Sequence, residues 1–187
     1  MKVTKILAMA ALLFAGAVHA QGYVQFEYYD EHNRATDKDN IKLAVVPGIK
    51  TADGWDYSLQ MSASQTDFGS GSITEGVEVR VRKLIAESNG VKLIGGVRVG
   101  EKITSSTHFS HYALDTMVKF PIAGALGGEV GYRYRNAFES GHDYETNRGH
   151  VALAYALTKQ DTVGVRWSRS YGDEEKDAWR VTYNRSF

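Results

Sequence analysis

The sequence predicts an all-β protein: a small antiparallel, transmembrane up-and-down β-barrel of about 10 strands, with about 8 to 12 as the range. Three observations carry this prediction: an N-terminal export signal, a series of segments in which apolar and polar residues alternate, and a last segment ending in phenylalanine. The 187 residues are 43% apolar and 11% aromatic, which is typical of a chain that folds. After residue 20 no run of about 18 apolar residues occurs, so no membrane-spanning helix is predicted.

The first residues have the pattern of a secretory signal peptide. Lys2 and Lys5 form a positive start, Ile6 to Val18 an apolar stretch, and Ala20 ends a small-residue cleavage site. A membrane-anchoring helix is the alternative, but this apolar stretch reaches only about 20 Å across a core of about 30 Å. We therefore expect residues 1–20 to be removed and residues 21–187 to form the barrel, outside the cytoplasm.

The mature chain repeats one pattern, in which apolar and polar residues alternate over about ten positions. The clearest example is Trp55 to Ser64, where every second residue is apolar. Pro47 lacks a backbone donor, so we expect it to end the second strand early. The predicted strands are 23–29, 41–50, 55–64, 76–82, 91–99, 111–120, 126–135, 149–157, 163–168 and 178–187.

The connections between these strands form two alternating sets. Short turns are predicted at 52–54, 86–90, 122–125 and 159–161, and longer, more charged loops at 34–40, 67–75, 105–110, 139–148 and 172–177. Short turns at one end and longer loops at the other are typical of outer-membrane barrels. An even strand number places both termini at the end with the short turns.

The apolar face is continuous, and its aromatic residues lie toward the ends of the segments. Tyr23, Trp55, Tyr112, Phe120 and Trp167 are examples. This distribution resembles the aromatic girdles that lie at membrane interfaces. The alternative is that the same residues form the core of a soluble β-sandwich.

The polar face is ionic, and in a barrel it faces the lumen. Its acidic residues are predicted to be Glu27, Asp56, Glu78, Asp115 and Glu129. Its basic residues are predicted to be Lys42, Arg80, Arg82, Lys92, Arg98, Lys119, Arg133, Arg135, Arg166 and Arg180. Rings of Arg and Lys favour anions in pores. The alternative is that these charges pair across strands and fill the barrel, because narrow barrels leave room for side chains only. The residues expected to face an anion are Arg80, Arg82, Arg98, Lys119, Arg133, Arg135, Arg166 and Arg180.

Composition excludes several other functions. Lys+Arg and Asp+Glu are equal at 22 each, so no polybasic surface for nucleic acid is predicted. The chain has no cysteine, which excludes disulfides, thiolate metal sites and thiol nucleophiles. No cofactor, metal site or catalytic residue is predicted. Four histidines, His108, His111, His142 and His150, are expected in or beside loops and exposed to solvent, with an enzyme at the barrel rim as the third hypothesis.

The last nine residues carry the most specific signal. Trp179, Val181, Tyr183 and Phe187 occupy alternate positions back from the terminal phenylalanine, with Arg185 as the one departure. This pattern resembles the C-terminal strand signature of bacterial outer-membrane β-barrel proteins. The resemblance implies an outer-membrane location, recognition by the barrel assembly machinery, and contact with outer-membrane lipid and lipopolysaccharide.

A second, weaker resemblance concerns the subclass. The run Tyr132-Arg133-Tyr134-Arg135 places arginines on one face of a small barrel. It resembles the oligogalacturonate-specific porins and their acidic-sugar relatives, although members of that family are longer. The resemblance implies a narrow channel for small anionic solutes such as acidic oligosaccharides. A structural or adhesive barrel with a plugged, salt-bridged interior is the alternative.

Overall fold

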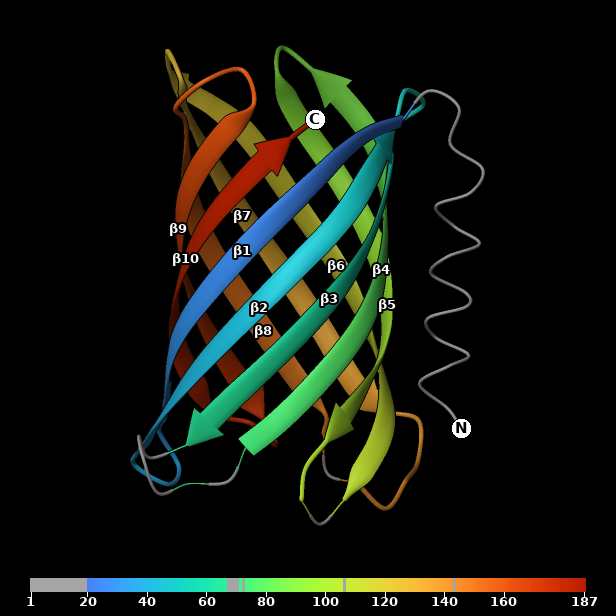
Figure 1. The fold of residues 1–187 in the computed structure, drawn as a ribbon, viewed down its shortest axis with the longest axis vertical. Helices are drawn as coiled ribbons and strands as arrows, with labels where there is room; N and C mark the ends of the chain where they lie inside the picture. The colour runs from blue at the N-terminus through green and yellow to red at the C-terminus, as the bar shows by residue number, and fades with distance from the viewer. Residues whose placement is uncertain (1–19, 67–70, 72, 106, 143) are drawn as a thin grey trace.

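The computed structural model is a closed barrel of ten antiparallel strands, which confirms the predicted fold class and strand number (Figure 1). It describes residues 20–66, 71, 73–105, 107–142 and 144–187, so the predicted signal peptide lies outside the described residues. None of the described segments is a helix long and apolar enough to cross a membrane. The strands are β1 (Ala20–Asn33), β2 (Lys38–Thr51), β3 (Trp55–Thr66), β4 (Ile73–Ser88), β5 (Val91–Ile103), β6 (His108–Ala123), β7 (Leu126–Ala137), β8 (Thr146–Ala156), β9 (Asp161–Gly172) and β10 (Lys176–Ser186).

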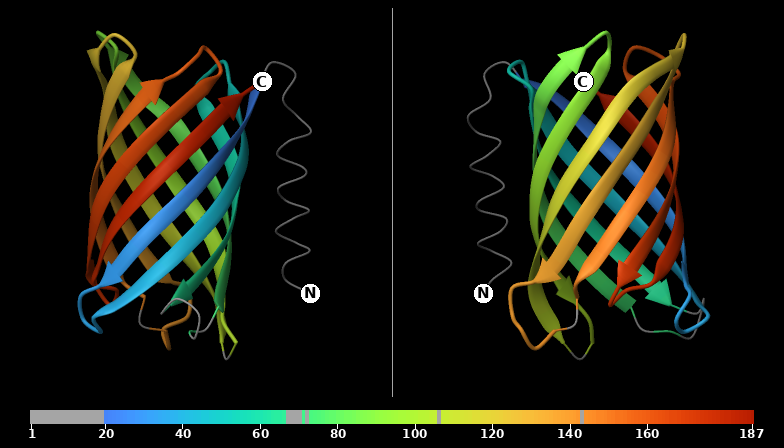
Figure 2. Two further views of the ribbon diagram at one scale, coloured as in Figure 1. Left: turned by 60° about the vertical axis from the view of Figure 1, so that its left-hand side comes forward. Right: turned by 180° about the vertical axis from the view of Figure 1, so that it is seen from behind.

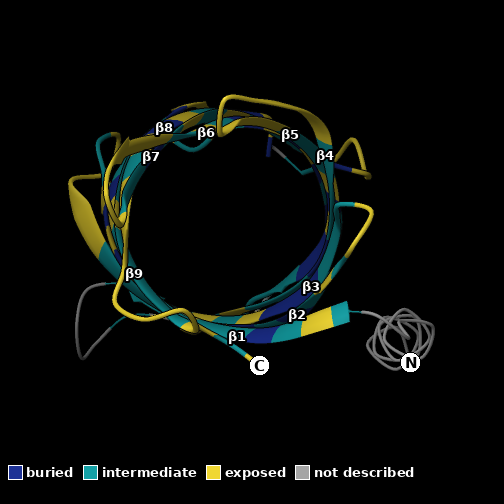
Figure 3. Cartoon of the chain, turned by 90° about the horizontal axis from the view of Figure 1, so that it is seen from above, coloured by how far each residue is buried: buried dark blue, intermediate teal, exposed yellow. Residues whose placement is uncertain are grey.

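Each strand pairs with its neighbours in sequence, and β1 closes the ring by pairing with β10. The closing register runs from Tyr23↔Ser186 to Asn33↔Lys176. Viewed along its axis, the wall is one continuous ring (Figure 3). Closure leaves no strand edge unpaired, which is the condition for a β-sheet to stand in a membrane.

The strands are longer than predicted, so the connections are shorter. Turns occupy 52–54, 89–90, 124–125 and 157–160 at the end that also holds the C-terminus and the start of β1, here called the turn end (Figure 2). The loops 34–37 and 173–175 lie at the opposite end, here called the loop end, where β3, β5 and β7 end and β4, β6 and β8 begin. The predicted loop boundaries were wrong because polar residues near strand ends stay in the ladder.

The β4–β5 turn shows how sequence fixes register. Asn89 and Gly90 both have positive φ, 50° and 78°. Asn-Gly at these two positions is the preferred sequence of a two-residue type I′ hairpin turn. This turn fixes the pairing that begins with Ser88↔Val91.

The expectation that Pro47 ends the second strand was wrong. β2 continues to Thr51, and Pro47 pairs with Val24 of β1. The pairing of β2 with β3 instead passes from Val45↔Met61 to Gly48↔Ser58. Proline has no N–H to donate, so the ladder loses contact on one side only and the strand persists.

The two faces of the wall separate as the alternation predicts. Apolar side chains such as Phe26, Leu43 and Leu114 are more than half exposed on the outer face. Aromatic pairs lie toward both ends of that face, with Trp55 stacked on Tyr57 near the turn end. Charged residues alternate with these and point into the barrel, so the polar interior is the candidate functional site.

Candidate functional site: the charged lumen

A continuous chain of ion pairs crosses the middle of the lumen. Arg180 Nη1 lies 2.9 Å from Glu27 Oε1, and Arg80 Nη1 lies 3.7 Å from the same oxygen. Arg80 Nε and Arg98 Nη1 each lie 2.8 Å from Glu78 Oε1. These pairs link β10, β1, β4 and β5.

The chain continues into β6 and β7 through one carboxylate. Asp115 accepts hydrogen bonds from Arg98 Nε and, at 2.7 Å, from Arg133 Nε. We call the whole set the central network: Glu27, Glu78, Arg80, Arg98, Asp115, Arg133 and Arg180. The side chains of Arg98 and Asp115 are each only 3% exposed, so this part of the lumen is closely filled.

A second cluster lies beside the central network, on β6 to β9. Glu129 is bound by Arg166 and lies 2.8 Å from His150 Nε2 and 3.4 Å from Lys119 Nζ. His111 Nε2 lies 3.5 Å from Glu78 of the central network. His111 and His150 are therefore buried inside the barrel, and the expectation that they are solvated was wrong, because alternation turns both rings to the lumen.

Two cavities lie on either side of the central network. The loop-end cavity has a volume of about 210 Å³ and the turn-end cavity about 540 Å³. Among the described residues, none lines both cavities. The charged side chains thus divide the lumen into two vestibules.

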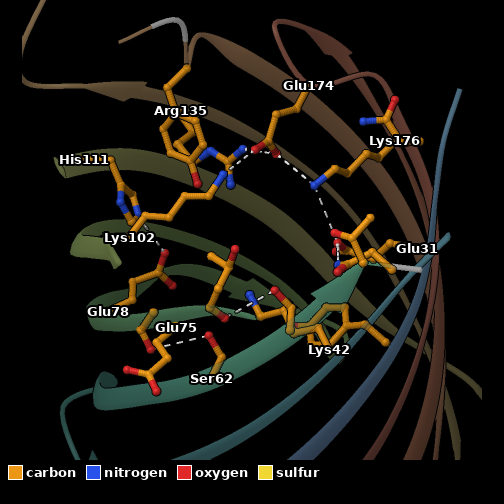
Figure 4. Close-up of a pocket in the computed structure, with 18 of the residues that line it drawn as sticks. Glu31, Lys42, Ser62, Glu75, Glu78, Lys102, His111, Arg135, Glu174 and Lys176 are labelled. Carbon is orange, nitrogen blue, oxygen red and sulfur yellow. Dashed lines mark hydrogen bonds and ion pairs between the residues drawn. The ribbon is translucent and has the colours of Figure 1, made fainter. Parts of the chain in front are cut away.

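A carboxylate from the β9–β10 loop, Glu174, lines the loop-end cavity (Figure 4). Glu174 accepts hydrogen bonds from Arg135 Nη2 at 2.7 Å and Lys102 Nζ at 3.0 Å, and lies 3.5 Å from Lys176 Nζ. The ring of Tyr144 lies beneath Arg135, whose Cζ is 3.8 Å from the ring centroid. Lys176 also lies 3.7 Å from Glu31, which ties this group to β1.

The charges around Glu174 keep it ionised. Burial alone would raise the pKa of this carboxyl, but Arg135, Lys176 and Lys102 outweigh burial and hold the pKa well below its ordinary value. Burial raises the pKa of the Tyr144 phenol to about 12, although Arg135 acts in the opposite direction. The group is therefore a carboxylate among cations, with a neutral phenol beside it.

In the turn-end cavity, less of the positive charge is neutralised by carboxylates than in the loop-end cavity. Arg82 pairs with Asp56 at 3.0 Å, and Asp56 also accepts a hydrogen bond from the Tyr23 hydroxyl at 2.7 Å. Lys50 lines the cavity with its Nζ 5.1 Å from the Tyr23 ring centroid, and within the part of the chain that is described no carboxylate lies within ion-pair distance of it. This vestibule therefore has an unneutralised cation near its opening.

All of the residues predicted to face an anion point into the lumen, although contact with an anion stays a prediction. Arg80, Arg98, Arg133 and Arg180 belong to the central network, Arg82, Lys119 and Arg166 line the turn-end cavity, and Arg135 lines the loop-end cavity. The inward residues that the sequence analysis missed are Glu31, Lys50, Lys102, Arg148, Glu174 and Lys176. Extending the alternation to the true strand ends finds most of these, whereas Glu174 lies in a loop where alternation does not apply.

The proposed assembly signal lies on the last strand. Trp179 and Val181 are both more than half exposed on the outer face, and Tyr183 stacks on Phe26 with ring centroids 6.5 Å apart. The backbone N–H of Phe187 donates to Gly22 O at 2.9 Å. Recognition of this strand by an assembly machinery stays a prediction.

No protein-family model matches the sequence, and no curated protein sequence matches it significantly. Among solved structures, the β domain of the Bordetella autotransporter BrkA has a TM-score of 0.57 at 11% identity, covering 90% of this chain and 99% of that one. An outer-membrane channel from Pseudomonas putida F1 has a TM-score of 0.56 at 9% identity, covering 91% and 96%. The KdgM porin in complex with disordered oligogalacturonate has a TM-score of 0.52 at 14% identity, covering 87% and 99%.

These likenesses show the fold. The chain shares its closed barrel with outer-membrane porins and channels and also with an autotransporter domain, and it is weakly similar to the oligogalacturonate porin, as its sequence suggested. The comparisons thus establish the barrel fold, and the function has to be argued from the lumen.

Proposed function

We propose that this chain is an outer-membrane channel for small anions, formed by residues 21–187 after export removes residues 1–20. The observation that carries this proposal is that single carboxylates in the lumen are shared by several cations. Glu27 and Asp115 each bind two arginines, and Glu174 contacts three basic side chains. The basic residues that line the two cavities also outnumber the acidic ones, and this excess favours entry of anions over cations.

Arginine donors without partners support the same conclusion. The Nε atoms of Arg82, Arg135, Arg166 and Arg180 are buried and have no hydrogen-bond partner among the described protein groups. A buried donor without a partner costs about 1–3 kcal/mol. An anion or water that reached these donors would satisfy them, so they are suited to a polar, anion-accepting lumen.

The central network sets the size of the solute. Because it separates the two cavities, small anions such as chloride and acetate pass more readily than chains of sugar units. Acidic oligosaccharides, the class to which the oligogalacturonate of the KdgM complex belongs, are larger anions and require arginine side chains to move aside. We therefore expect them to act here as slow permeants or as blockers.

The decisive measurement is conductance of the refolded barrel in a planar bilayer with a tenfold KCl gradient. We expect discrete channels whose reversal potential reports chloride preference, and we expect added oligogalacturonate to reduce the current. High salt should weaken the preference, because the Debye length falls to about 3 Å at 1 M. A cation-selective channel would contradict the proposal.

A structural barrel with a plugged interior is the second candidate, favoured by the finding that no described residue lines both cavities. Such a barrel stays silent in the same bilayer while keeping its folded, heat-resistant form on gels. Contacts with lipopolysaccharide, outer-membrane lipid and the assembly machinery belong to both candidates.

A further inference from the structure

Glu174 is held inside the barrel mouth by the two loops beside it. The loop 173–175 follows Gly172, whose φ is 100° and whose hydrogen faces the Glu145 carbonyl, where a Cβ would lie 2.3 Å from the oxygen. Asp173 N donates to Glu145 O at 2.9 Å, and Glu145 N donates to Asp173 Oδ2 at 2.6 Å. On the other side, Arg34 N donates to Glu175 O at 2.9 Å. The loop is thus fixed in a position that turns Glu174 inward.

The side chains that receive Glu174 come from three other parts of the barrel. Lys102 lies near the end of β5, Arg135 near the end of β7, and Lys176 begins β10 (Figure 4). Tyr144, buried on the β7–β8 loop, packs against them, with Lys102 Nζ 4.9 Å from its ring centroid. The buried Arg135 Nε has no partner among the described groups, although its Nη2 binds Glu174.

This arrangement can bind a carboxylate, and the carboxylate of Glu174 already occupies it. Two donors at 2.7 and 3.0 Å and a third cation at 3.5 Å exceed what one carboxylate needs to be neutralised. Charge-assisted hydrogen bonds of this kind are the strong ones in proteins. If Glu174 leaves, Lys102 and Arg135 lose the carboxylate that they contact, and Lys176 keeps only Glu31, at 3.7 Å. Leaving these cations without their counter-charge in a confined volume is costly unless another anion replaces Glu174.

We propose that Lys102, Arg135 and Lys176 form an anion-binding site at the loop end of the lumen, that Glu174 occupies it as an internal ligand, and that small carboxylates from solution compete for it. This deepens the proposed function, on which it rests for the direction of solute entry, but binding itself requires no conduction. A tethered carboxylate acts at a high effective concentration, so it excludes weak solutes and yields to abundant or multivalent ones.

The test is binding of ¹³C-acetate to refolded protein in detergent, followed by NMR line broadening. Glu174→Gln keeps the size of the side chain and removes its charge, and we expect acetate to bind it at least tenfold more tightly than it binds the wild type. Glu175→Gln is the matched control, because it removes the same charge from the exposed neighbour in the same loop. We expect this control to bind acetate as the wild type does.

A second substitution locates the site. In the double variant Glu174→Gln, Arg135→Gln, we expect the gained affinity to be lost. Equal acetate affinity in the wild type and Glu174→Gln overturns the proposal, as does an equal gain in Glu175→Gln, which would report net charge alone. If Glu174→Gln fails to refold, Glu174→Asp serves instead, because its shorter reach weakens the internal ligand and should also tighten acetate binding.

Conductance separates this proposal from the proposed function. If Glu174→Gln tightens acetate binding but the barrel does not conduct in the bilayer, the anion site is supported and the channel is contradicted. If the barrel conducts anions but Glu174→Gln binds acetate no better than the wild type, the channel is supported and the anion site is contradicted.

Discussion

The two ends of the lumen carry the same sign of charge but neutralise it differently. At the loop end, Lys102, Arg135 and Lys176 share Glu174, a carboxylate supplied by a loop. At the turn end, Lys50 lines a larger cavity, with no carboxylate within ion-pair distance among the described residues. The loop 173–175 is about as short as the turns at the turn end, but backbone hydrogen bonds to Glu145 and Arg34 hold it in the position that turns Glu174 inward. The difference teaches that compensation of lumen charge depends on connections as well as on strands.

The central network keeps the two ends distinct, so its loss should have the largest effect. Asp115→Asn removes the buried carboxylate shared by the buried Arg98 and the partly buried Arg133. Breaking a buried ion pair from one side costs about 3–5 kcal/mol. We expect the free energy of unfolding, measured by urea titration in lipid vesicles, to fall by that amount. Because the central network separates the two cavities, its loss should also connect them, and the conductance of any channel should rise.

The control for this change is an exposed pair at the turn end. Glu87→Gln removes the partner of Lys92, and both side chains are more than 40% exposed. Exposed ion pairs contribute about 0–1 kcal/mol, so stability should hardly change. A similar loss in the two variants would show that Asp115 is no more buried from solvent than Glu87.

The comparison becomes sharper when each end loses one charge. Lys50→Gln removes an uncompensated cation at the turn end, and Glu174→Gln removes the compensating carboxylate at the loop end. We expect opposite shifts in anion-over-cation permeability, a fall for Lys50→Gln and a rise for Glu174→Gln, each of roughly two- to fivefold at low salt. Reversal potentials in a KCl gradient measure both. Shifts of the same sign would mean that the ends do not act as separate charged vestibules.

Sequence reasoning was most reliable where one rule governs a whole strand. Alternation placed Arg80, Arg98 and Asp115 inside the barrel, because a period of two fixes the face of every residue once one is known. It could not show that Arg98 binds Asp115 and Glu78 together, because partners on neighbouring strands depend on register. The predicted strands were too short, since charged ends such as Lys102 were left outside them.

The site at the loop end was the part least accessible from sequence. Glu174 lies in an acidic run that resembles a solvated loop, and its position depends on Gly172 and on hydrogen bonds with the β7–β8 loop. His111 and His150 show the same limit, because their distance from the barrel end determines whether they meet water or Glu78 and Glu129. Loops and strand ends therefore need the three-dimensional structure, whereas strand interiors do not.

The smallest expected effect concerns pH, and it tests whether Glu174 is ionised inside the mouth. Its pKa is held well below the ordinary value of 4.5, because the pull of Arg135, Lys176 and Lys102 outweighs the opposing effect of burial. A lowered pKa in the folded state means that the ionised form stabilises the fold above the unfolded pKa. That contribution is lost as pH falls through the folded pKa.

The difference in unfolding free energy between wild type and Glu174→Gln should thus stay constant from pH 8 to about pH 5 and shrink only at more acidic pH. The other charged groups near Glu174 are present in both proteins, so comparing the two reduces their contribution. Urea titrations at stepped pH measure the difference, and a difference that already fades near pH 6 would show that the three cations do not hold this carboxylate.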